Sequence, residues 1–205
     1  DGVNNIPMAS LLDREAVLQG LKSNVPKSGI SHILRVETYA IELAHQHQLD
    51  IDATAKAAFL HDLAKYFSPE RLLTMAQQEG LPIDPVEETD PRLLHAEVSA
   101  IVARDDFKIQ DTEILDAIRN HTLGRSSMSP MSCIVFLADS LEPGRGDHID
   151  LKRIRKVSKS NLYEAVGLTC DRTLHQLIAR QMPIHPRVIL TRNWAIDAAK
   201  DLALR

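Results

Sequence analysis

Four histidines and one aspartate occupy positions where the surrounding sequence is apolar and has helical spacing. They are His32, His61, His95, His121 and Asp139. A buried imidazole or carboxylate costs about 1–3 kcal/mol if it has no partner. One such residue is usually a satisfied core residue, but five in one chain favour a shared site. A divalent metal would offset several of these costs together, because imidazole and carboxylate are among its preferred ligands.

His61 is followed at once by Asp62. Adjacent side chains on a helix point about 100° apart. Since these two side chains differ in length, both can still reach an ion that lies between their directions. The pair therefore predicts part of a metal chelate, whose remaining ligands must come from other helices.

The elements that position these residues are predicted to be helices. Ser68-Pro69, Asp90-Pro91 and Ser129-Pro130 are typical helix starts, as is Asp111, and Gly80 and Gly124 are typical ends. Apolar residues recur with a helical period, and alternation of period two is almost absent. We predict an all-α fold with about nine helices around one metal site. Their ranges are near 9–23, 31–48, 52–66, 69–79, 91–105, 111–123, 129–142, 160–181 and 186–204.

The domain organisation is predicted to be simple. Residues 1–8 form an N-terminal tail, and 9–205 form a single domain that includes the C-terminal helices. The stretch 144–150 is the clearest loop, and the basic run 152–156 that follows is best explained as a solvated helix face.

Composition excludes several classes of protein. The net charge of −4 argues against a protein built to hold nucleic acid. No apolar run approaches the roughly 18 residues of a membrane helix, and residues 1–5 lack the features of a secretory signal. Cys133 and Cys170 match neither a disulfide framework nor a zinc spacing, which favours the cytoplasm.

The order His32, His61-Asp62, His95, His121, Asp139 resembles the HD domain, an all-helical family of metal-dependent phosphohydrolases named for its His-Asp pair. The surrounding residues resemble its bacterial YqeK-like branch over about residues 14–197. The matching stretches are Ser31–Val36, Phe59–Tyr66, Leu94–Ala96, Arg119–Gly124, Leu137–Pro143, Ile184–Pro186 and Thr191–Asn193. The resemblance implies symmetrical hydrolysis of diadenosine tetraphosphate to two ADP, and an association with iron.

The resemblance also implies roles for individual residues. It makes His32, His61, Asp62 and Asp139 the metal ligands, with Fe expected and Mn, Co or Zn also suitable. Asp62, His95 and His121 form the expected catalytic set, and either histidine could help to bind a second ion. The residues expected to contact the substrate are His32, Asp62, Lys65, His95, His121, Thr122, Asp139 and Arg145.

Three of these residues also have simpler explanations. Lys65 lies four residues after His61, so it shares a helix face with it and could meet a phosphate, but it could equally be a solvated lysine. Arg145 lies between two glycines, where the backbone is free to bring a guanidinium onto a phosphate, although a plain turn would have the same sequence. Thr122 could simply belong to a helix C-terminus.

The sequence leaves three hypotheses about function. The first is a symmetrical dinucleoside tetraphosphatase. The second is another HD phosphohydrolase acting on a different nucleotide, and the third is a metal or nucleotide sensor without turnover. The first predicts a dinucleoside polyphosphate substrate and ADP as product, with no nucleic-acid or membrane partner, and it is compatible with a homodimer.

Overall fold

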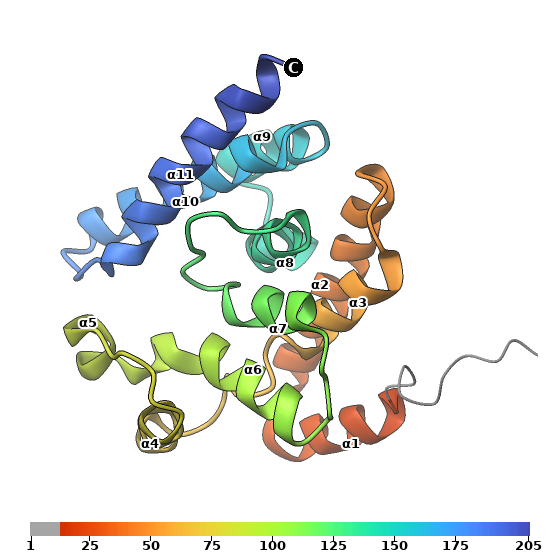
Figure 1. The fold of residues 1–205 in the computed structure, drawn as a ribbon, viewed down its shortest axis with the longest axis vertical. Coiled ribbons are helices and arrows are strands. Elements are labelled where there is room, and N and C mark those ends of the chain that lie inside the picture. Colours follow the sequence, from red (N-terminus) through yellow and green to blue (C-terminus); the bar gives the residue numbers. More distant parts are fainter. Residues whose placement is uncertain (1–12) are drawn as a thin grey trace, which may run out of the picture.

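The computed structural model describes residues 13–205, and all of their regular structure is helical (Figure 1). This confirms the predicted all-α class. The predicted tail 1–8 and residues 9–12 of the first predicted helix lie outside the described residues. The helices are α1 (Arg14–Asn24), α2 (Lys27–Gln46), α3 (Ile51–Leu60), α4 (Pro69–Gln78), α5 (Pro85–Thr89), the 3-10 helix η2 (Pro91–Leu94), α6 (His95–Asp105), α7 (Thr112–Arg119), α8 (Pro130–Leu141), the 3-10 helix η3 (Pro143–Arg145), α9 (Ile149–Ser158), α10 (Leu162–Ala179) and α11 (Pro186–Ala203).

The predicted helix starts form for the expected physical reason. The side chains of Ser68, Asp111 and Ser129 each accept a backbone N–H from the first turn of the helix that follows. Asp90 differs, because its side chain accepts no backbone N–H and Pro91 begins a 3-10 helix. The predicted helix 91–105 is therefore divided into η2 and α6.

Two predicted helices end earlier than expected. The range 52–66 ends at Leu60 and the range 111–123 ends at Arg119. The N–H of His61 and the N–H of His121 each bond to the carbonyl three residues back instead of four, so the backbone forms tighter turns there. His61 and His121 therefore lie just beyond helix C-termini and not within helices.

Two helices were not predicted as separate elements. The short helix α5 forms because Asp84 and Glu87 make a reciprocal capping box. Helix α9 begins at Ile149, inside the predicted loop, and buries Leu151 and Ile154 on one face. Of the basic run, Lys152, Arg153 and Lys156 are exposed as expected, whereas Arg155 is largely buried and donates to the carbonyls of Leu141 and Glu142. The described residues thus contain eleven α-helices.

Helix α8 lies at the centre of the molecule (Figure 1). Its side chains are buried along almost the whole length, and it packs against α2, α3, α7, α9 and α10. The buried apolar residues form two clusters, one on the side of α4, α6 and α7 and one on the side of α9, α10 and α11. Since α2, α3 and α8 contribute to both clusters, they connect the two halves of the core.

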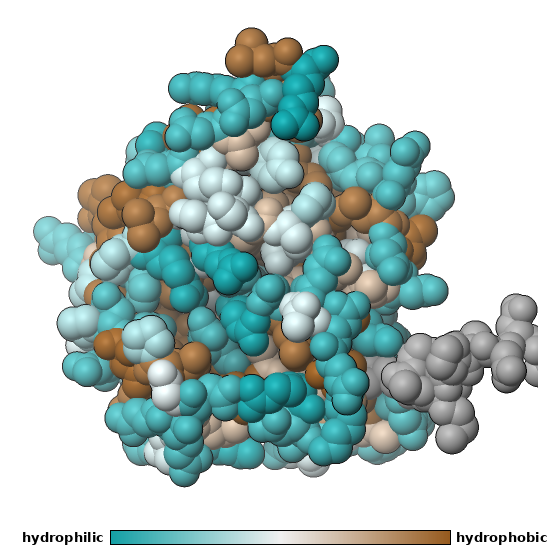
Figure 2. All heavy atoms as spheres, viewed as in Figure 1, coloured by the Kyte–Doolittle hydropathy of each residue, from teal (hydrophilic) through white to brown (hydrophobic). Residues whose placement is uncertain are grey.

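The face of the molecule in Figure 2 is mostly hydrophilic, with separate apolar patches. Among residues 13–205, no helix has both the length and the apolarity that crossing a membrane requires.

The turn after α7 is anchored by α11. Thr191 Oγ1 donates a hydrogen bond to the carbonyl of Leu123, 2.9 Å away. Gly124 adopts φ +65°, and a Cβ at this position would lie 2.5 Å from Thr191 Cγ2. The glycine therefore permits both the left-handed backbone and the close approach of α11.

We predict that Gly124→Ala destabilises the fold by about 2 kcal/mol more than Gly80→Ala, measured by urea unfolding. Gly80 also has positive φ, at +75°, but a Cβ there would have no neighbour within 4 Å. Gly80→Ala therefore isolates the backbone strain, about 1 kcal/mol. Equal losses in the two variants would show that the contact with Thr191 does not matter.

Candidate metal centre

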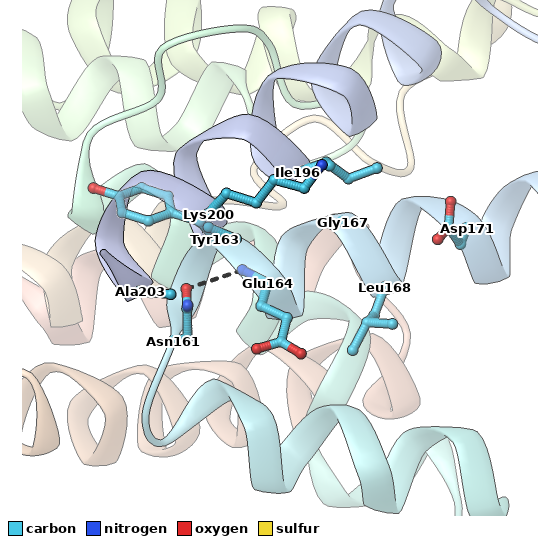
Figure 3. Close-up of a pocket in the computed structure, with 10 residues that line it drawn as sticks. Asn161, Tyr163, Glu164, Gly167, Leu168, Asp171, Ile196, Lys200 and Ala203 are labelled. Atoms are coloured by element: carbon cyan, nitrogen blue, oxygen red, sulfur yellow. Dashed lines mark hydrogen bonds between the residues drawn. The ribbon is translucent and has the colours of Figure 1, made fainter. Parts of the chain in front are cut away.

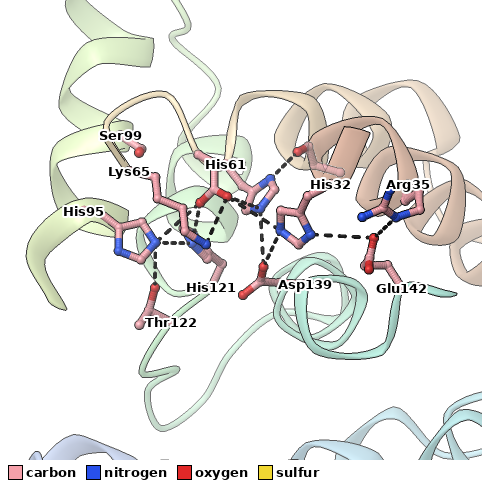
Figure 4. A network of polar contacts seen from close by, with 12 residues as sticks. His32, Arg35, His61, Lys65, His95, Ser99, His121, Thr122, Asp139 and Glu142 are labelled. Carbon is pink, nitrogen blue, oxygen red and sulfur yellow. Dashed lines mark hydrogen bonds and ion pairs between the residues drawn. The ribbon is translucent and has the colours of Figure 1, made fainter. Parts of the chain in front are cut away.

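Five helices bring the predicted histidines and aspartates to one place (Figure 4). One histidine lies within α2, the His-Asp pair follows α3, one histidine begins α6, one follows α7, and the second aspartate lies near the end of α8. In chain order they are His32, His61, Asp62, His95, His121 and Asp139.

The first group consists of His32, His61, Asp62 and Asp139. One ligand atom from each lies within 4.8 Å of all the others. His32 Nε2 is 2.9 Å from Asp139 Oδ1, and His61 Nε2 is 3.2 Å from Asp62 Oδ2. Two imidazoles and two carboxylates thus converge on one small volume.

The second group consists of Asp62, His95 and His121. The Nε2 atoms of the two histidines lie 3.0 Å apart, and each lies 3.4 Å from Asp62 Oδ1. Oδ2 of Asp62 faces the first group, so the two oxygens of this carboxylate contact different groups.

The backbone fixes the orientation of three imidazoles. In His61, His95 and His121, Nδ1 lies 2.6–2.8 Å from the backbone carbonyl three residues earlier. Each of these carbonyls also accepts the backbone N–H of the same histidine, and its second lone pair accepts the Nδ1–H. The bond holds the proton on Nδ1 and leaves Nε2 as the atom that faces the carboxylates.

The donor set fits a divalent metal. His61 Nε2 and Asp62 Oδ1 are buried and make no hydrogen bond. Buried polar atoms normally have partners, so two such atoms in one cluster indicate a ligand. Imidazole nitrogens and carboxylate oxygens together suit a first-row ion such as Fe, Mn, Co or Zn.

The electrostatics of the site are set by burial and by mutual pairing. Burial acts to lower the pKa of His61, but the carboxylates of Asp62 and Asp139 outweigh it and raise this pKa to about 10. Burial acts to raise the pKa of Asp62, and the surrounding imidazoles hold it well below its usual range. Burial lowers the pKa of His121. The pairing thus favours ionised carboxylates beside a protonated imidazole.

The three other predicted residues lie around this centre. Arg145 donates from Nε to the backbone carbonyl of Asp139, at 2.9 Å, and from Nη2 to Oδ1 of the same residue, at 3.2 Å. Thr122 Oγ1 lies 3.4 Å from His95 Nε2. Lys65 Nζ lies 3.7 Å from Asp62 Oδ2. The prediction that Lys65 shares a helix face with His61 is wrong, because α3 ends at Leu60, before both residues.

The structure adds three residues that were not predicted. Ser99 on α6 accepts the N–H of Ala64 and so ties the turn after α3 to α6. Arg35 and Glu142 form an ion pair beside His32. A serine inside the apolar pattern of α6 and an acid at the buried end of α8 were the available signals, but neither specifies a partner.

A cavity of about 330 Å³ lies elsewhere, between α10 and α11 (Figure 3). Leu168, Ile196 and Ala199 line it, with Glu164 and Lys200 at its edge. It contains none of the predicted site residues. The chemical groups are therefore concentrated in the histidine and aspartate centre and not in this cavity.

Comparison with known proteins gives a family match across the part of the chain that contains this centre. Residues 29–144, which include all six histidine and aspartate positions, match the HD domain. The chain is 30% identical over 188 residues to a symmetrical bis(5'-nucleosyl)-tetraphosphatase of Bacillus subtilis, covering 92% of this chain and 100% of that one. It is 31% identical over 182 residues to a protein of the same name from Halalkalibacterium halodurans, covering 89% and 96%.

A solved structure shows the same fold. The crystal structure of a predicted HD superfamily hydrolase involved in NAD metabolism, from Clostridium acetobutylicum, superposes with a TM-score of 0.85. The two chains are 28% identical, and the match covers 90% of this chain and 97% of the other.

We predict that metal binding releases a proton and weakens as the pH falls. Because the pKa of His61 is about 10 in the metal-free site, this residue carries a proton at neutral pH that the metal must displace. For one released proton, the apparent affinity for Mn²⁺ should fall about tenfold per pH unit between pH 8 and pH 6. Calorimetry in buffers of different ionisation enthalpy measures this release. An enthalpy that is independent of the buffer would contradict the prediction.

Proposed function

The chain belongs to the HD-domain family, and from this membership we propose that it hydrolyses diadenosine tetraphosphate symmetrically to two ADP. The observation that carries the proposal is the buried carboxylate of Asp62, which lies between a four-residue metal-type cluster and a pair of facing histidines. The relatives described above carry this activity in their names. The reaction adds water across the central P–O–P link of the tetraphosphate.

The metal would be held by His32, His61, Asp62 and Asp139. When bound, a divalent ion supplies acidification of water and polarisation of a phosphoryl oxygen. We propose iron as the natural ion, with Mn, Co or Zn as alternatives that the same donors accept. The group of Asp62, His95 and His121 has the composition to hold a second ion instead of acting through protons alone.

His95 and His121 are proposed to hold the proton that the leaving group requires. Each donates from Nδ1 to a backbone carbonyl, so a bond between their Nε2 atoms needs one further proton on one ring. The side chain of His121 is fully buried, whereas that of His95 is 14% exposed. His95 is therefore placed to donate this proton to the bridging oxygen as the P–O bond breaks, with His121 and Asp62 holding its ring.

The cations at the rim are proposed to bind the phosphates. The side chain of Arg145 is 40% exposed, and that of Lys65 is 34% exposed, so both reach solvent while remaining within ion-pair distance of a site carboxylate. Their positive charge would neutralise the developing charge on the phosphoryl oxygens. Thr122 adds a hydroxyl beside His95.

The remaining expectations stay proposals of the same kind. We propose that residues 9–205 act as one domain, since α2, α3 and α8 join both halves of the described core. We also propose the cytoplasm as its location, because Cys133 and Cys170 are buried free thiols. A homodimer remains compatible with this function.

Product analysis tests the proposed reaction. Metal-loaded protein incubated with diadenosine tetraphosphate should give only ADP, resolved by ion-exchange chromatography. Asp62→Asn should lose at least about 1,000-fold in kcat and should also lose bound metal, because it removes a carboxylate common to both groups. ATP plus AMP as products would contradict the symmetric reaction. Tight nucleotide binding without turnover would favour the sensor, and turnover of another nucleotide alone would favour a different HD phosphohydrolase.

Arg145→Ala should lower kcat/KM for the tetraphosphate by about 10- to 100-fold, since a hydrogen bond to a charged group contributes about 1.5–3 kcal/mol. Arg192→Ala is the matched control, because Arg192 is similarly exposed and is also paired with an aspartate, Asp171, but lies on α11 away from the metal centre. Steady-state kinetics on both variants measures the difference. An unchanged kcat/KM in Arg145→Ala would remove this residue from the substrate site.

A further inference from the structure

His32 differs from the other histidines of the centre in its position on its helix. It lies inside α2, where the carbonyls of an α-helix are used by the N–H four residues on. His61, His95 and His121 lie at helix ends, where the carbonyl three residues back accepts the Nδ1–H as well as the backbone N–H of the same histidine. His32 therefore needs a side chain to do what the backbone does for the other three.

The carboxylate of Glu142 lies where an acceptor for His32 Nδ1 is needed. Its Oε2 lies 3.6 Å from His32 Nδ1, on the side of the ring opposite Asp139 (Figure 4). The side chain is 1% exposed, and its second oxygen, Oε1, makes no hydrogen bond. Oε2, the oxygen that faces the imidazole, already accepts from Arg35, and it keeps a further lone pair that can accept from His32 Nδ1.

Several contacts hold this carboxylate in place. Arg35, one turn after His32 on α2, donates from Nε to Oε2 at 2.5 Å. Gly144 makes room for this pair, because a Cβ there would lie 2.5 Å from the guanidinium nitrogens. Arg155 donates to the carbonyls of Leu141 and Glu142 and so fixes the backbone that carries the acid.

We propose that Glu142 is a positioning residue of the metal centre. Its carboxylate accepts a hydrogen bond from Nδ1–H of His32, which leaves Nε2 of that ring free for the metal. His32 Nε2 lies 2.9 Å from Asp139 Oδ1, on the side of the ring that faces the other proposed ligands. A metal at Nε2 excludes a proton from that atom, so the neutral ring must carry its proton on Nδ1. Glu142 then accepts a hydrogen bond from that N–H. Arg35 acts one step further out by orienting Glu142. This inference rests on the metal centre of the proposed function.

Titration with Co²⁺ tests the inference, because its visible absorption reports the ligand field as well as the affinity. Glu142→Gln should weaken Co²⁺ binding by about 10- to 100-fold and alter the spectrum of the bound ion. Glu87→Gln is the matched control, since Glu87 is also buried and lies 3.2 Å from a histidine, His185, that is outside the centre. This control should bind Co²⁺ within about twofold of the wild-type protein.

The Arg35→Gln variant keeps the test decisive if Glu142→Gln does not fold, because the Arg35 side chain is 41% exposed. It should also weaken binding, and in a folded double variant it should add nothing to the effect of Glu142→Gln. Wild-type affinity and spectrum in Glu142→Gln, or losses equal to those of Glu87→Gln, would overturn the inference. So would wild-type binding in Arg35→Gln when only that variant folds. A wild-type protein that binds no Co²⁺ would instead contradict the proposed function.

Discussion

The buried carboxylate of Asp62 is the constraint on which the rest of the centre depends. Its side chain is 3% exposed, yet it stays ionised because imidazoles surround it on two sides. An isolated buried carboxylate would instead take up a proton. Each histidine that contacts it must come from a different helix end or helix face, so the charge of Asp62 fixes how α2, α3, α6 and α7 meet. These helices therefore place imidazoles around a carboxylate inside an apolar core.

The ends of helices supply what this arrangement requires. The last carbonyls of a helix have no N–H four residues on to accept, and a histidine just beyond the helix can bond back to one of them through both its backbone N–H and its Nδ1–H. His61 and His121 use this geometry, which explains why both helices are shorter than the apolar pattern suggested. The same carbonyls that would be a cost at a buried helix end become the supports that orient the imidazoles. The bonds from these histidines to the carbonyls therefore both stabilise the helix ends and orient the imidazoles.

The centre combines rigid ligands with cations that are less confined. The imidazoles and carboxylates are at most 18% exposed, whereas the side chains of Arg145 and Lys65 are 40% and 34% exposed. Such a division suits hydrolysis of a phosphoanhydride, in which positioning and charge neutralisation contribute most of the catalysis. A net charge of −4 does not conflict with an anionic substrate, because positive charge is needed only locally, at the rim of the centre.

The sequence by itself determined the helical class, most helix starts and the chemical residues of the centre. Capping residues and apolar periodicity act locally, and six ionisable residues in apolar surroundings require a common partner whatever the topology. The sequence could not determine the roles of Arg35, Ser99 and Glu142, which contact the centre only through residues distant in the chain. It also misplaced the end of α3, because the apolar pattern continues past Leu60. Only the tertiary structure decided these points, since bonds between side chain and backbone across helices follow from packing and leave no periodic signal.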